Sequence, residues 1–118
     1  MRRMSLVALL AALLAGGCGG GGDRPPEEVA RDYVASGDPA KCDDADFGFL
    51  ERQSRRKGEE AREACRRSVE GASPPKDVRV RSHEVRGDRA EVVLDADGQR
   101  VRVTLRRDDG EWRVAGFG

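Results

Sequence analysis

The chain has 118 residues, with 22 basic and 22 acidic side chains and only 4% aromatic residues. A dedicated nucleic-acid binder normally carries a strong basic excess, so this balance argues against nucleic acid as a partner. The length suits one small domain, and the scarcity of aromatic residues predicts a modest core.

The first 17 residues have the three parts of a secretory signal peptide. Arg2 and Arg3 come first, the unbroken apolar run 6–15 follows, and small residues end the segment. Ten apolar residues fall short of the ~20 that a membrane-spanning helix needs. The segment therefore predicts export, and its removal would leave 20 basic against 22 acidic residues, a net charge of −2.

Cys18 follows directly after the small residues, and this arrangement resembles the lipobox of bacterial lipoproteins. The resemblance implies a diacylglycerol on the Cys18 thiol and cleavage that makes Cys18 the new N-terminus. The family usually has Leu three residues before the cysteine, whereas this chain has Ala15 there and Leu14 one step earlier. We expect an extracytoplasmic protein held on the cell membrane by lipid. The alternative is ordinary cleavage near Gly17, which would leave a free secreted protein.

Residues 18–24 are rich in glycine and predict a flexible tether ahead of a domain over residues 25–118. Once Cys18 is assigned to lipid, Cys42 and Cys65 remain as a pair, and an oxidising compartment predicts a disulfide between them. Closing that loop would stabilise the fold by roughly 3 kcal/mol. The competing interpretations are a metal site or a reactive thiol. His83 is the sole histidine and no second Cys/His cluster exists, so we expect no metal and no cofactor.

Helical patterns extend to about residue 71. Pro25-Pro26 suits the first turn of a helix that ends at Gly37, and Asp38-Pro39 predicts the cap of a short second helix that carries Cys42. A further helix is expected over residues 58–70, with one apolar face and Gly71 as its cap, and its register points Cys65 toward the core. The apolar positions of the two longer helices are Val29, Ala30, Tyr33 and Val34, then Ala61, Ala64, Cys65 and Val69.

Two charged stretches separate these helices. Residues 43–48 faintly resemble a calcium loop, but the third carboxylate and the full spacing are missing. We therefore expect an acidic turn with Phe47, Phe49 and Leu50 packing inward. The basic run 52–57 is expected to be a solvated surface.

After Lys76 the apolar period changes to two, which predicts four strands. Gly87-Asp88, Asp97-Gly98 and Asp109-Gly110 separate them, and the last two pairs are strong hairpin signals. Two-residue loops set the registers, and the apolar residues that these registers pair then fall on one face, which predicts an antiparallel meander with one buried side. The expected pairs are Leu94–Val101, Val92–Val103, Ala90–Leu105, Leu105–Val114 and Arg107–Trp112.

The opposite face of this sheet is predicted to be rich in arginine, with Glu91 and Asp95 beside it and Asp95 facing Arg100. Aromatic interleaving is absent and the carboxylates offset the charge, so nucleic acid is again not expected. In the first strand, Val78 and Val80 are out of phase with Val85, and a bulge near Ser82 would bring all three onto the same face. It would also place His83 opposite Val92, at the rim of the apolar side. The arginines of the outer face are Arg100, Arg102, Arg106 and Arg113.

The helices, the hairpin Val85-Arg86-Gly87-Asp88-Arg89-Ala90 and the closing Asp109-Gly110-Glu111-Trp112-Arg113-Val114 carry a second resemblance. Residues 27–117 are similar to small bacterial lipoproteins of the nuclear transport factor 2-like (cystatin-like) superfamily. The resemblance implies an α+β fold, with N-terminal helices packed on a bent four-stranded antiparallel meander that forms a cone. The mouth of such a cone can hold a small apolar ligand.

Enzymes of that superfamily, such as ketosteroid isomerases and SnoaL-like cyclases, place Asp, His and Tyr inside the cone. This chain offers only Tyr33 and His83, with no inward aspartate, so no acid–base pair can be assembled. We therefore expect a non-enzymatic, membrane-tethered accessory or protein-interaction domain. The alternative is a binder of small apolar molecules, and an enzyme comes last. A cone filled by Trp112, Phe117 and Tyr33 would favour interaction, and an empty one would favour ligand binding. The residues expected to line the pocket are Tyr33, His83, Val92, Val103 and Trp112.

Overall fold

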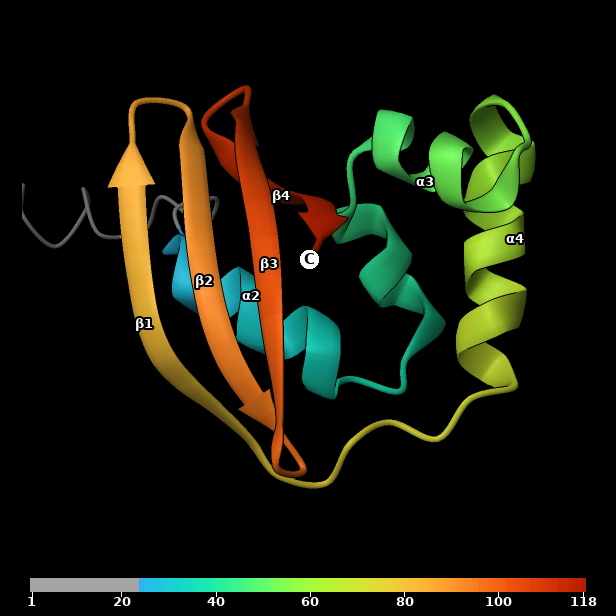
Figure 1. Cartoon of the computed structure of the whole chain (residues 1–118). Helices are drawn as coiled ribbons and strands as arrows, with labels where there is room; N and C mark the ends of the chain where they lie inside the picture. The colour runs from blue at the N-terminus through green and yellow to red at the C-terminus, as the bar shows by residue number, and fades with distance from the viewer. Residues whose placement is uncertain (1–23) are drawn as a thin grey trace, which may run out of the picture.

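The computed structural model describes residues 24–118, which form an α+β fold (Figure 1). Helices come first, and a four-stranded antiparallel sheet of order β1-β2-β3-β4 follows, which confirms the predicted fold class. The predicted signal peptide, Cys18 and most of the Gly-rich tether lie outside the described residues.

The first two helical segments follow the predicted signals. Helix α2 spans Pro26–Ala35 with proline in its first turn, and the 3-10 helix η1 spans Pro39–Asp44. The Asp38 carboxylate caps η1 by accepting a hydrogen bond of 2.9 Å from the backbone N–H of Ala40. Proline and the cap residue therefore decide where both segments begin.

Helix α3, Phe47–Ser54, was not predicted. The sequence indicated an acidic turn and a basic surface here, because charged residues outnumber apolar ones across residues 43–57. Phe49 and Leu50 are buried as expected, but Phe47 is exposed, with the Arg62 guanidinium 4.3 Å from its ring centre. The inward packing predicted for Phe47 is therefore wrong. Arg55 ends the helix in the left-handed conformation, and α4 then spans Gly58–Glu70 as predicted.

The strands are β1, Val78–Arg86; β2, Arg89–Ala96; β3, Gln99–Asp108; and β4, Glu111–Phe117. All five predicted cross-strand pairs are present. Asp97 and Asp109 adopt positive φ in their turns, each followed by a glycine that also has positive φ, as two-residue hairpins require. The predicted bulge lies between Val80 and Ser82.

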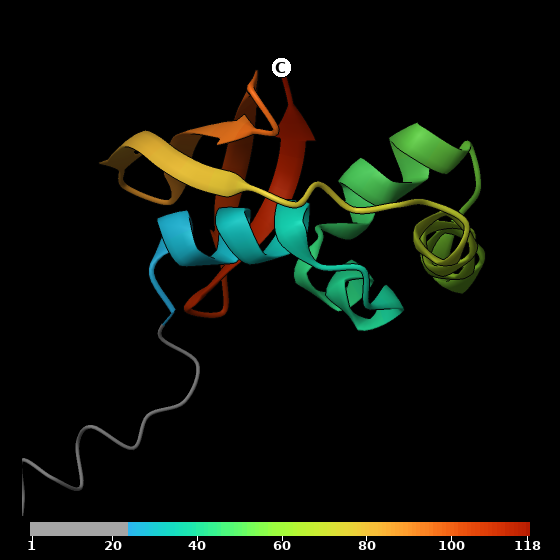
Figure 2. The same cartoon turned by 90° about the horizontal axis from the view of Figure 1, so that it is seen from below.

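The core lies between α2 and the concave face of the sheet (Figure 2). Helices α3 and α4 lie beside the sheet rather than over it, and α4 packs on α3 and η1 without touching any strand. The buried side chains that α2 and the sheet contribute to this core are Val29, Ala30, Tyr33, Ala90, Val92, Leu94, Val103, Leu105, Trp112 and Val114.

The two edges of the sheet differ. The segment between η1 and α3 covers the β4 edge, where the Asp46 N–H donates to the Val114 carbonyl at 2.8 Å. Arg52 and Arg113 add hydrogen bonds from their guanidinium groups to the carbonyls of Ala115 and Asp43. Within the described residues, β1 pairs only with β2, so its outer edge is open.

Candidate functional site

The interior of the bent sheet is filled with side chains. Val92 and Val103, both expected to line a pocket, have none of their surface exposed. Trp112 is 7% exposed and packs in the same core, with the Arg107 guanidinium 4.5 Å from its ring centre. Among residues 24–118, no charged side chain is buried, and Tyr33 is the one buried residue that carries a hydroxyl.

His83 lies opposite Val92 at the rim, as the bulge predicted. Its Nε2 is 3.8 Å from Oε2 of Glu27 in the first turn of α2, and its side chain is 47% exposed. Tyr33 lies six residues further along α2, or about 9 Å at the helical rise. The two polar groups considered for chemistry therefore do not converge on one point.

An open groove lies at the end of the sheet that carries the β2–β3 turn. Its larger part has a volume of about 780 Å³, and an adjoining hollow of about 280 Å³ extends toward α4. We call the two together the mouth groove. Their shared walls come from the end of α2, from η1, from the connection before β1 and from the end of β4; they are Tyr33, Val34, Lys41, Ser73, Pro74, Pro75 and Phe117.

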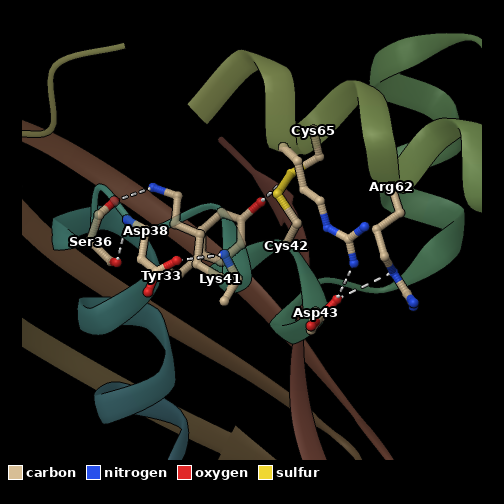
Figure 3. The surroundings of a disulfide bond; sticks show 10 residues. Tyr33, Ser36, Asp38, Lys41, Cys42, Asp43, Arg62 and Cys65 are labelled. Carbon is tan, nitrogen blue, oxygen red and sulfur yellow. Dashed lines mark hydrogen bonds and ion pairs between the residues drawn. A yellow bond between two sulfur atoms is a disulfide. The ribbon is translucent and has the colours of Figure 1, made fainter. Parts of the chain in front are cut away.

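Tyr33 is the one predicted pocket residue that lines the mouth groove. Burial, with a smaller contribution from the charge of Asp44, raises the pKa of Tyr33 to about 12. Its hydroxyl lies 3.9 Å from Sγ of Cys65 (Figure 3). The phenol is therefore neutral at physiological pH and serves as part of the wall.

Lys41 supplies a cation to the same groove. Its Nζ donates to the Ser36 carbonyl at 2.8 Å and lies 5.1 Å from the centre of the Tyr33 ring. Burial lowers the pKa of Lys41. No carboxylate in the described part of the chain forms an ion pair with it, since the salt bridges found there involve other residues.

The predicted disulfide joins Cys42 to Cys65, with their Cα atoms 6.1 Å apart. It links η1 to α4, and the Tyr33 hydroxyl points toward it (Figure 3). The Asp43 carboxylate adds contacts of 3.5 and 3.3 Å to Arg62 and Arg66 of α4.

The outer face of the sheet is basic, as predicted, but its ion pairs differ from the prediction. Asp95 faces Arg100 in the register, yet its carboxylate pairs with Arg81 at 2.8 Å. The bulge brings Arg81 to this position, and the strand pattern alone did not indicate which arginine would reach Asp95. Arg102 approaches Glu91 at 3.8 Å.

Sequence reasoning missed Lys41 and the two prolines as groove residues. Pro74-Pro75 indicated a stiff connection between α4 and β1, but the position of this connection beside the end of α2 depends on where α4 ends. Nothing in the local pattern around Lys41 distinguished it from a solvated lysine.

Comparison with protein-family models, curated proteins and solved structures finds no match for this chain. Within residues 24–118, no helix has the length and apolar character to cross a membrane, and no group of three or more metal-ligating side chains is found.

Proposed function

We propose that this protein is a membrane-tethered, extracytoplasmic lipoprotein whose domain acts without catalysis, by binding another protein. The observation that carries the proposal is the filled interior of the bent sheet. A cone occupied by Val92, Val103 and Trp112 leaves no room for a substrate beneath α2. The alternative of an apolar ligand inside the cone requires the space that these side chains occupy.

The distribution of polar groups supports a non-enzymatic role. General acid–base catalysis needs two groups within reach of one substrate. Enzymes use burial to bring the pKa values of such groups near the working pH. Tyr33 lies in the last turn of α2, whereas His83 of β1 lies beside Glu27 in its first turn and is half exposed. Burial keeps Tyr33 protonated rather than poised near neutral pH.

The open edge of β1 offers a surface for a protein partner. Val80 and Val85 pair with Leu94 and Ala90 and share their face, yet they remain 36% and 46% exposed. An unpaired strand edge beside exposed valines can accept an extended segment of another chain by strand addition.

The tether is tested by the Cys18→Ala variant. The wild type should partition into the membrane fraction and carry a lipid mass on Cys18, and the variant should lose both. A soluble, unmodified wild-type protein that begins after residue 17 would contradict the proposal.

The partner is tested on protein extracted from its own membrane in mild detergent. Native mass spectrometry should show a second protein, and a photo-crosslinker at Val85 should capture it. The same crosslinker at Thr104, in the centre of the outer face, is the matched control. Equal capture at both positions, or a native mass of the bare protein alone, would refute the assignment of β1.

A further inference from the structure

We infer that the mouth groove binds a small amphipathic carboxylate, with the Lys41 ammonium receiving the anionic head. This site lies outside the filled interior, at the end of the sheet. It does not depend on the lipid tether or on the β1 partner.

The groove has an apolar wall. Val34 of α2, Val101 of β3 and Phe117 of β4 line it together with Pro74 and Pro75. The larger part of the groove, about 780 Å³, falls within the usual range for sites that hold small ligands. Apolar side chains gathered in a hollow indicate a binding surface rather than scattered exposure.

Phe117 leaves part of this apolar wall exposed to solvent. Its ring packs against Tyr33 and Phe49, with ring centres 6.0 and 5.6 Å apart. The residue nevertheless stays 42% exposed. A large apolar side chain that is packed on one side and open on the other is suited to the hydrocarbon part of a ligand.

The charges of the groove select an anion. Asp97 is the one carboxylate among its described lining residues, and that carboxylate already accepts backbone N–H bonds from Lys76 and Asp77 at 2.8–3.1 Å. Among residues 24–118, no carboxylate forms an ion pair with Lys41, so none of these residues neutralises its charge.

Lys41 also has a structural role, because its bond to the Ser36 carbonyl satisfies the C-terminal end of α2. That role uses one of the three N–H donors of the ammonium. The remaining two suit a carboxylate. A phosphate more often binds the planar fork of arginine, and the described residues that line the groove include no arginine.

The test is a titration of the full chain in its Cys18→Ala form with sodium decanoate, followed by backbone amide chemical shifts. Decanoate should saturate one site, with the largest shifts around Val101 and Phe117. Lys41→Met should raise Kd about tenfold or more, as the loss of a charged hydrogen bond does. Lys41→Arg and the exposed control Lys57→Met should bind like the parent.

Decyltrimethylammonium has the same chain with the opposite charge and should bind at least tenfold more weakly. Gln99→Glu provides a second variant, since it adds a carboxylate to the groove wall without removing the Lys41 contact. It should also weaken decanoate binding. The inference is overturned if decanoate does not saturate, if the cationic amphiphile binds equally well, or if Lys41→Met and Gln99→Glu bind like the parent.

Discussion

The disulfide is expected to hold α4 in place, because little else does. Within the described residues, helix α4 packs mainly on α3 and η1, with Sγ of Cys65 also 3.9 Å from the Tyr33 hydroxyl of α2, and Ala61 is its one buried residue. An isolated helix of 13 residues is marginal in water. The partly exposed ion pairs of Asp43 with Arg62 and Arg66 contribute about 1 kcal/mol each.

The Cys42–Cys65 bridge closes a loop with a sequence separation of 23, for which loss of the constraint costs roughly 3 kcal/mol. This exceeds the contribution of either ion pair. Cys42→Ala/Cys65→Ala, made in the Cys18→Ala background, should therefore release α4 before the sheet unfolds.

Amide hydrogen exchange measures this directly, with the Cys18→Ala chain and its intact disulfide as the control. Amides of α4 should approach the unprotected exchange rate in the variant, while those of β2 and β3 remain the most protected. If α4 amides stay as protected as those of β2 and β3, packing rather than the disulfide holds the helix, and the reasoning is refuted.

Three further outcomes are expected. Trp112→Ala should lower the free energy of unfolding by about 3 kcal/mol or more, since it removes the largest core side chain and its contact with Arg107; a loss under about 1 kcal/mol in chemical denaturation would contradict a structural role. Tyr33 is the sole tyrosine, so phenolate absorbance should show it titrating near pH 12. The native state keeps this proton, while the unfolded chain loses it near pH 10. The contribution of Tyr33 to the free energy of unfolding should therefore be full below about pH 10 and fall by ~2–3 kcal/mol as pH rises to about 12. Titration near pH 10 in the folded protein would disprove burial. Asp97→Gly keeps the positive φ of the turn but removes the carboxylate that holds the Lys76 N–H, so denaturant unfolding should show a loss of about 1 kcal/mol, and an unchanged midpoint would contradict that role.

Where local rules dominate, the sequence alone was sufficient. The alternation of the strands and the turns at Asp97 and Asp109 determined the registers, because a shift by one residue would expose the whole buried face. The bulge before Ser82 followed from the same requirement. The Cys42–Cys65 pairing followed from cysteine number and the expected compartment.

Local rules failed at α3. Its charged residues, Glu51 and Arg52, stay at least partly exposed, and burial of Phe49 and Leu50 sufficed to fix the short helix against the core. The strand pattern also could not identify Arg81 as the ion-pair partner of Asp95. A long arginine side chain at a bulge can reach several carboxylates, and the bend of the strands decides which one is near.

Only the tertiary structure decided whether the sheet encloses a cavity. The interior is filled because side chains from α2 and three strands together occupy the volume between the helix and the sheet. That volume depends on how far the sheet bends. The mouth groove likewise forms where η1, the segment before β1 and the end of β4 meet. Lys41 and Phe117 lie 76 positions apart in the chain, so no local pattern could show that they share a wall.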